Sequence, residues 1–143
     1  MKDLVVDSGV AVKWFVAEDD SPQVLQILRD YRSEKFSFLA PDLLYAEFGN
    51  IIWKKVVFNN LDPNDADFAI SEFKRISFTL SPITLLFDNA YKIAVKHKRT
   101  FYDSLYLALS VRENCEFVTA DEKFYNSVRG NYPKIILLAD WNR

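Results

Sequence analysis

Short apolar runs recur along this chain with helical patterns between them, and this alternation limits the possible folds more than any other feature. Strands that alternate with helices favour a mostly parallel sheet that is covered on both faces. The first run is apolar at consecutive positions, as expected for a buried central strand. The sequence therefore predicts an α/β fold with a five-stranded, mostly parallel sheet, whose strands are expected at 4–6, 36–40, 77–80, 116–119 and 134–138.

Helices are expected between and after these runs. Ser21 and Pro22 form an N-cap followed by a proline at the first helical position, and a further helix follows Asp62 and Pro63. The remaining helices are expected at about 10–16, 42–58, 83–98 and 101–112, with a last one beginning near Asp121. At 143 residues, half of them hydrophobic, the chain is expected to form one domain over 1–143 with a single core.

Four carboxylates occupy positions that chemistry explains better than folding does. Asp7 and Asp121 follow apolar runs, and ligands of an open α/β sheet bind outside the carboxyl ends of its strands. Glu47 interrupts the apolar stripe of a helix, where an unpaired charge is costly, and Asp103 opens another helix. Four converging acids would repel one another, and a hard cation such as Mg²⁺ or Mn²⁺ removes that penalty. The arrangement predicts a metal site.

Each of these acids also has a purely structural interpretation. Thr100 and Asp103 match a capping box ahead of an apolar run. Asp7 and Asp121 could each cap the helix that follows, and Glu47 could be a rim residue paired with a lysine. The combination favours a site, because three loops at one sheet edge and one half-buried helix position all supply an acid.

Other reactive residues are interpreted as structural. Asp140 follows an apolar run, but it lies near the chain end and is not included in the site. His97 closes the apolar stripe of its helix and is expected to pack rather than to catalyse. The single cysteine, Cys115, excludes an internal disulfide framework, and no Cys/His nucleophilic site is expected. The sequence contains neither a P-loop nor a GxGxxG motif.

The charge balance requires any polyanion to bind a local patch, because the net charge is only −2. Basic side chains could form a positive rim around the acids, suited to the phosphates that flank a scissile bond, or could simply be solvated helix faces. These residues are Lys13, Lys54, Lys92, Lys96 and Arg99, and the last three are expected on one helix face, at i, i+4 and i+7.

The location and the association of the chain are also constrained. No apolar run approaches the length of a membrane span, and the N-terminus does not resemble a signal peptide, so a soluble cytoplasmic protein is expected. Aromatic residues make up 15% of the chain, which fits either an aromatic-rich core or a buried protein–protein interface.

Four segments resemble, in the same order, the motifs of the PIN-domain family and, within it, of the VapC-type toxin ribonucleases. They are VVDSGVAVKWFVAE, PDLLYAEFGNIIWK, TFYDSLYLAL and TADEKF. The resemblance implies a three-layer α/β/α domain that cleaves RNA as the toxin of a toxin–antitoxin pair. It implies one or two Mg²⁺ or Mn²⁺ ions as cofactors, a homodimer, and neutralisation by a small antitoxin. The implied catalytic and metal-binding residues are Asp7, Glu47, Asp103 and Asp121.

One position departs from the family pattern. The family often has Ser or Thr two residues after the first aspartate, whereas this chain has Gly9 there and Ser8 one position earlier. Thr119 matches a threonine that precedes the last acid by two residues, and it is expected to orient Asp121.

Three other functions stay open at this stage. Asp7 could be the covalent nucleophile of a phosphotransferase, although the neighbouring Ser8 and Gly9 do not supply the second acid which that chemistry usually needs. The chain could be a non-catalytic protein-interaction module. It could also be a metal-dependent DNA nuclease, because metal chemistry on a phosphodiester does not require a 2′-hydroxyl.

Overall fold

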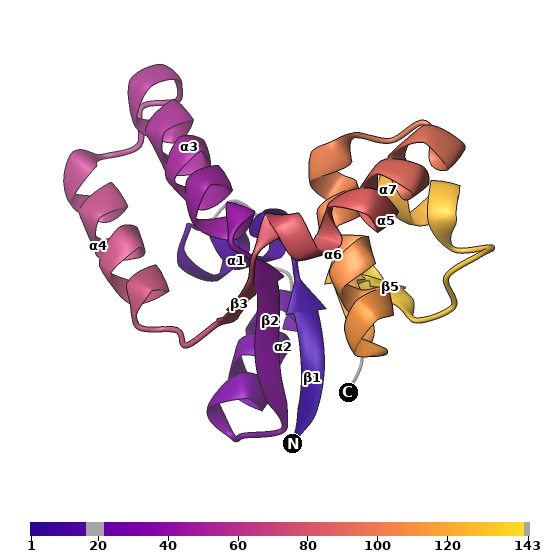
Figure 1. The fold of residues 1–143 in the computed structure, drawn as a ribbon. Helices are drawn as coiled ribbons and strands as arrows, with labels where there is room; N and C mark the ends of the chain where they lie inside the picture. The colour runs from indigo at the N-terminus through magenta and orange to yellow at the C-terminus, as the bar shows by residue number, and fades with distance from the viewer. Residues whose placement is uncertain (17–21, 142–143) are drawn as a thin grey trace.

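The computed structural model describes residues 1–16 and 22–141, and within them five strands form one sheet. The strand order is β3-β2-β1-β4-β5, and every neighbouring pair is parallel (Figure 1). The predicted α/β class and the parallel sheet are therefore confirmed. The strands are β1 (Lys2–Val6), β2 (Phe36–Pro41), β3 (Thr79–Ser81), β4 (Glu116–Thr119) and β5 (Ile135–Leu137).

The predicted helices are all present, with small differences at their ends. They are α1 (Ser8–Phe15), α2 (Pro22–Arg32), α3 (Leu43–Phe58), α4 (Pro63–Lys74), α5 (Ile83–His97), α6 (Phe101–Glu113) and α7 (Glu122–Val128), followed by the short 3₁₀ helix η1 (Leu138–Asp140). Helix α5 ends at His97 because Lys98 adopts a left-handed conformation with φ of 53°. The proposed N-cap Ser21 lies outside the described residues.

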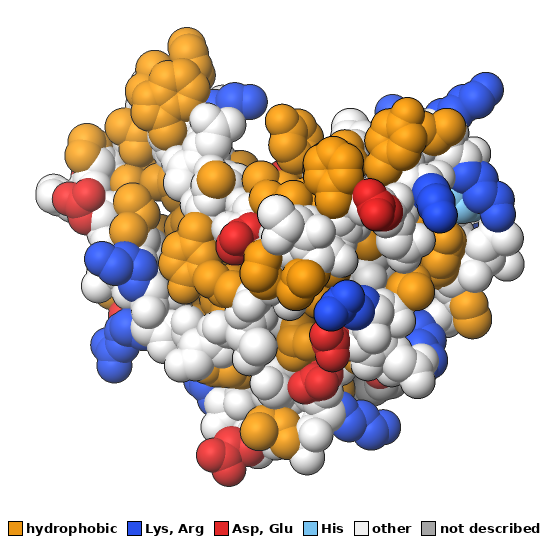
Figure 2. Space-filling view, in the orientation of Figure 1, with side chains coloured by type: hydrophobic (Ala, Val, Ile, Leu, Met, Phe, Trp, Pro, Cys, Tyr) orange, Lys and Arg blue, Asp and Glu red, His pale blue; other side chains and the backbone are white. Residues whose placement is uncertain are grey.

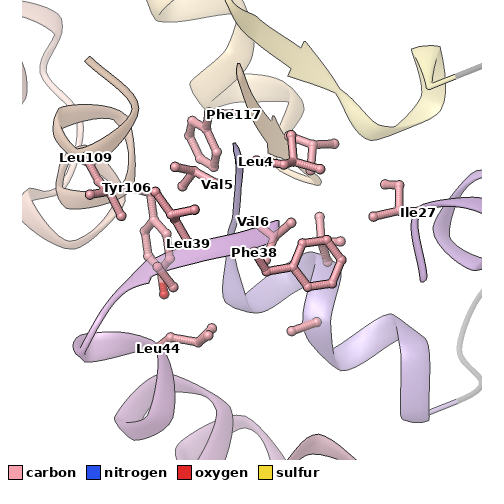
Figure 3. Packing of buried hydrophobic residues seen from close by; sticks show 14 of the residues in the cluster. Leu4, Val5, Val6, Ile27, Phe38, Leu39, Leu44, Tyr106, Leu109 and Phe117 are labelled. Carbon is pink, nitrogen blue, oxygen red and sulfur yellow. The ribbon is translucent and has the colours of Figure 1, made fainter. Parts of the chain in front are cut away.

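Strand β1 is the centre of the sheet, as its unbroken apolar run predicted. Leu4, Val5 and Val6 are completely buried. Successive side chains point to opposite faces of a strand, and Figure 3 shows this alternation: Val5 lies with Tyr106 of α6, whereas Leu4 lies toward Ile27 of α2. Both faces of the strand therefore contact helices, which is why no polar residue interrupts the run.

Helices cover both faces of the sheet, so the predicted three-layer α/β/α arrangement is confirmed. Helices α1 to α4 lie on one side of the sheet and α5 to α7 on the other (Figure 1). Helix α6 packs on β1, β2 and β4, and α5 packs along α6. None of the described helices combines the length and the apolar character that crossing a membrane requires.

The order of the strands determines where a site can form. From β1 the chain proceeds to β2 and β3 on one side of the sheet, and later to β4 and β5 on the other. The direction of winding therefore reverses between β1 and β4, and ligands of α/β sheets bind at such a switch point, beyond the carboxyl ends of the strands. In the ribbon view the arrowheads of β1 and β2 point toward the level at which the α3–α4 pair and the α5–α7 group diverge (Figure 1).

Candidate active site

Asp7 and Asp121 follow the two neighbouring strands at the switch point, Asp7 directly after β1 and Asp121 with one residue between it and β4. Both are helix N-caps. The backbone N–H of Val10 donates to Asp7 Oδ1 at 2.9 Å, and that of Phe124 donates to Asp121 Oδ1 at 3.0 Å. The capping interpretation of these acids is thus correct, and capping is also what fixes both carboxylates at the edge of the sheet.

Thr119, the last residue of β4, joins these two positions. Its hydroxyl donates to Asp7 Oδ2 at 2.6 Å and accepts the backbone N–H of Asp121 at 3.0 Å. Both carboxylate oxygens of Asp7 are therefore hydrogen-bonded. The sequence led us to expect that Thr119 orients Asp121, and the structure shows that it contacts the Asp121 backbone while its proton goes to Asp7.

Gly9 leaves room next to Asp7 for the hydroxyl that the family often has at this position. A Cβ atom placed on Gly9 would lie 3.4 Å from Asp7 Oδ1 and 3.4 Å from the Cβ of Ala120. The nearby hydroxyls in this chain are instead those of Thr119 on Asp7 and of Ser8, which hydrogen-bonds Glu47.

Glu47 reaches the site from α3. Its side chain is partly buried, as its place on the apolar stripe predicted, and the buried residues of that helix are Leu44, Phe48 and Ile52. The hydroxyl of Tyr106 donates to Glu47 Oε1 at 2.6 Å.

Tyr106 is a residue of this region that sequence reasoning missed. It lies on α6, and it is only 2% exposed. The available signal was a tyrosine within the apolar stretch that follows Asp103, since the hydroxyl of a buried tyrosine needs a hydrogen-bond partner.

Asp103 lies in the first turn of α6, where the predicted capping pattern is present. The N-cap is Thr100, whose Oγ1 accepts the backbone N–H of Asp103 at 3.1 Å. A hydrogen bond from Thr100 also reaches the Asp103 carboxylate and lowers its pKa, but burial has the larger effect and raises it. The Asp103 side chain is partly buried, and it lines the same recess as Asp7 and Thr119 at the strand ends.

The charges of the four acids are coupled through Asp103. Burial raises the pKa of Asp7 to about 6, and the negative charge of Asp103 adds to that effect. Burial also raises the pKa of Glu47, again with a contribution from Asp103, and Asp121 contributes to the raised pKa of Asp103. Asp103 therefore interacts with each of the other three acids, which places it at the centre of the group.

A narrow recess separates Asp7 from Asp103. Its walls include Tyr106, Phe117 and Thr119, and its volume of ≈10 Å³ is enough for roughly one water molecule. Within residues 1–16 and 22–141, however, no three or more His, Cys, Asp or Glu side chains lie close enough together to hold one metal ion.

The donor set nevertheless fits a hard divalent cation. All the candidate donors are carboxylate or hydroxyl oxygens, and Mg²⁺ keeps several water ligands while it binds only one or two carboxylates. Burial and mutual repulsion disfavour the ionised acids, and a cation would relieve that repulsion. The side chains that could hold such an ion are those of Asp7, Glu47, Asp103 and Asp121.

The basic residues are placed unequally around these acids. Arg99 lowers the pKa of Asp103 and is therefore near the site. Arg99 lies beyond the end of α5. The prediction that it shares a helix face with Lys92 and Lys96 is therefore wrong. Lys54 is exposed on α3.

A further cation, Lys55, was not predicted. Burial lowers the pKa of Lys55, and the charge of Lys13 on α1 lowers it further, so these two lysines are close to each other.

Three further residues were interpreted from the sequence as structural. His97 packs edge-on against Tyr132, with 5.8 Å between the ring centroids. Cys115 is a free thiol ahead of β4, and Asp140 is exposed in η1.

Comparisons with known proteins agree with this geometry. A family model described as the PIN domain matches residues 4–129. No curated protein matches the chain. The crystal structure of PAE2754 from Pyrobaculum aerophilum is similar, with a TM-score of 0.65 and 24% identity over 96% of this chain and 92% of that one. The crystal structure of VapBC2 from Rickettsia felis, bound to a DNA fragment from their promoter, has a TM-score of 0.64 and 14% identity over 94% and 96% of the two chains. At these identities the solved structures support the fold alone.

Proposed function

Because this chain belongs to the PIN domain family, whose members are generally nucleases, we propose that it is a metal-dependent endoribonuclease that hydrolyses RNA phosphodiester bonds. The observation that carries the proposal is the placement of Asp7 and Asp121 at the switch point of the sheet, with Asp103 close enough for its charge to raise the pKa of Asp7 and of Glu47. No ion pair found among the described residues includes any of these acids. Their charge is therefore available to a cation from solution.

The residues proposed to hold Mg²⁺ or Mn²⁺, as one or two ions, are Asp7, Glu47, Asp103 and Asp121. When bound, such ions activate the attacking water and stabilise the leaving oxygen. Thr119 holds Asp7 through Oδ2, and the N-terminus of α1 holds it through Oδ1. Both bonds limit rotation of the carboxylate, so this chain supplies an oriented donor rather than a mobile one.

The substrate is proposed to approach the carboxyl ends of the strands, where Asp7 and Asp103 border the recess. Arg99 is the cation best placed to contact a phosphate beside Asp103. Lys13, Lys54, Lys92 and Lys96 are proposed as further phosphate contacts, and Lys55 joins them because it lies near Lys13.

We further propose that the protein is the toxin of a toxin–antitoxin pair, that it acts in the cytoplasm, and that it forms a homodimer. The resemblance of its four motifs to VapC-type toxins and its similarity in fold to VapBC2 support this role. Exposed apolar side chains on α3, α4 and α5 offer surfaces for a second copy and for a small antitoxin (Figure 2). They include Trp53, Val57, Phe58, Phe68, Phe87, Tyr91 and Val95.

The test is cleavage of a mixed pool of structured RNA by the purified protein in Mg²⁺ or Mn²⁺, with single-stranded DNA of matched sequence in parallel. RNA cutting that EDTA abolishes supports the proposal, and equal cutting of DNA would instead favour a general metal-dependent nuclease. No cutting with either metal, together with no Mn²⁺ binding in calorimetry, would favour a non-catalytic interaction module.

A further inference from the structure

Tyr106 connects the two groups of helices at the level of the acids. Its ring belongs to the core, where it stacks with Phe117 at 6.1 Å between centroids. Figure 3 shows the ring beside Leu39, with its oxygen turned toward the helix that carries Leu44, which is α3. The hydrogen-bond partner, Glu47, is 59 residues away in the sequence. One side chain of α6 therefore spans from the buried core to the acid of α3.

The hydroxyl of Tyr106 is a permanent hydrogen-bond donor. Burial raises the pKa of Tyr106 far above its usual range, and the charges of Glu47 and Asp7 raise it further. The distance of 2.6 Å to Glu47 Oε1 is typical of a charge-assisted bond from a hydroxyl to a carboxylate. The hydroxyl of Ser8 also hydrogen-bonds both Tyr106 and Glu47.

Glu47 needs this donor because its surroundings disfavour the ionised carboxylate. Burial raises the pKa of Glu47, the charge of Asp103 raises it further, and the hydrogen bond from Tyr106 at 2.6 Å is the largest of the effects that lower it. A glutamate side chain is flexible, and a partly buried carboxylate beside a like charge is better solvated when it turns outward to water. The bond to Oε1 opposes that rotation and determines which oxygen Glu47 presents to Asp7 and Asp103.

We propose that Tyr106 is a positioning residue, whose buried hydroxyl holds the Glu47 carboxylate in one orientation against the repulsion of Asp103. The consequence for metal binding rests on the proposed function, because it requires that Glu47 contributes to a metal site. The positioning itself is a property of the metal-free protein and is tested there.

The first experiment compares crystal structures of the metal-free wild type and of Tyr106→Phe, which keeps the ring and removes only the oxygen. We expect one Glu47 orientation in the wild type and several, or an outward one, in the variant. Asp103→Asn added to Tyr106→Phe removes the repulsion and should restore a single orientation. Because packing alone would not respond to Asp103, the double variant separates positioning from a general loss of order.

The second experiment measures Mn²⁺ binding by calorimetry. Tyr106→Phe should bind Mn²⁺ about 10-fold more weakly, the usual loss when a group that orients a metal ligand is removed. The matched control is Tyr31→Phe, because the Tyr31 hydroxyl also makes one hydrogen bond, from the backbone N–H of Ser77 at 3.0 Å, and its ring also stacks in the core. This control should lose a similar amount of stability and bind Mn²⁺ like the wild type.

An unchanged Glu47 orientation in Tyr106→Phe overturns the inference, whatever the metal affinity. Equal weakening of Mn²⁺ binding in Tyr31→Phe also overturns it, since the effect would then follow from stability alone. A displaced Glu47 in a protein whose wild type binds no Mn²⁺ supports the positioning role and contradicts the proposed function, so the two failures are distinguishable.

Discussion

The two edges of the sheet hold buried negative charge in opposite ways. At the edge where β2 begins, Asp30 is 1% exposed, accepts a hydrogen bond from Gln26 at 2.8 Å and lies 3.6 Å from the ammonium group of Lys35. At the carboxyl edge, Asp7 and Glu47 accept hydrogen bonds from hydroxyl and N–H groups and are repelled by Asp103. The chain thus supplies a cation to the first carboxylate and only uncharged donors to the others.

This difference distinguishes Asp30 from the acids of the proposed site more clearly than burial or cavity size does. The edge where β1 and β4 begin has a broad depression of ≈480 Å³, lined by Lys2, Asp3, Cys115 and Glu116 among others, but its charges are of both signs. The recess between Asp7 and Asp103 has only ≈10 Å³, yet it is bordered by two acids of one coupled group. A concentration of one sign of charge, held in place by neutral donors, is what predicts a cation site.

The acids at the carboxyl ends of the strands would not differ in role from Asp30 if they only stabilised helix starts. Asp103→Asn tests this, and its effect on RNA cleavage is the largest that we expect. We expect RNA cleavage to fall roughly 100-fold or more, because a centre that stabilises several kcal/mol of developing charge loses its central acid. The melting temperature of the metal-free protein should stay the same or rise. Thr100 still caps the backbone N–H of residue 103, and the repulsion among the acids is relieved.

Asp62 is a control carboxylate at the start of another helix, away from these acids. Asp62 caps α4 by accepting the N–H of Asn64 at 2.7 Å, and it is exposed. Asp62→Asn should leave cleavage unchanged, which turnover measurements on both variants would establish. If Asp103→Asn instead lowers the melting temperature by many degrees more than Asp62→Asn does, the Asp103 carboxylate serves mainly to stabilise the start of α6 and the site assignment is wrong.

The raised pKa of Asp7 predicts how stability depends on pH. The pKa of about 6 in the folded protein exceeds the ordinary value of 3.8, so the folded state binds more protons than the unfolded state between these values. Stability contributed by Asp7 is therefore present below pH 4 and lost as the pH rises to 6, in total about 3 kcal/mol at 1.36 kcal/mol per pKa unit. Urea unfolding of metal-free wild type and Asp7→Asn should show this difference, and parallel pH profiles would contradict it.

Much of the fold could be predicted because its signals are local. The unbroken apolar run at 4–6 and the helix start at Pro63 each depend on a few neighbouring residues. The end of α5 was misplaced by one residue because Lys98, rather than a glycine, adopts the left-handed conformation there. Arg99 follows Lys98 and therefore lies beyond α5, away from the helix face that carries Lys92 and Lys96.

The candidate site was predictable where residues follow strand ends and unpredictable where side chains meet across the fold. Asp7 and Asp121 were found because parallel strands bring their carboxyl ends to one edge. The bonds from Tyr106 to Glu47 and from Thr119 to Asp7 join residues far apart in the chain, and no spacing in the sequence encodes them. The missed part is therefore the set of groups that orient the acids.

Mn²⁺ should stabilise the folded protein through the acids at the carboxyl ends of the strands, and Asp30 should not contribute to this effect. A cation present at about 100 times its Kd raises the free energy of unfolding by about 2.7 kcal/mol if it binds only the folded state. We expect this increment in the wild type and in Asp30→Asn, and we expect it to be lost in Asp103→Asn and after addition of EDTA. Thermal unfolding with and without Mn²⁺ measures it, and an undiminished increment in Asp103→Asn would place the bound ion elsewhere.

The smallest expected effect is that of replacing Asp30, which lies where β2 begins. Asp30→Asn should lower the free energy of unfolding by about 1 kcal/mol, because the hydrogen bond from Gln26 weakens without the charge and the attraction to Lys35 is lost. The loss is small since the Lys35 side chain is 64% exposed. Cleavage and Mn²⁺ binding should not change, whereas Asp7→Asn at pH 7 should stabilise the metal-free protein. If Asp30→Asn is stabilising as well, the missing hydrogen bond at Asp30 Oδ2 outweighs the ion pair, and the two edges do not differ in the way proposed.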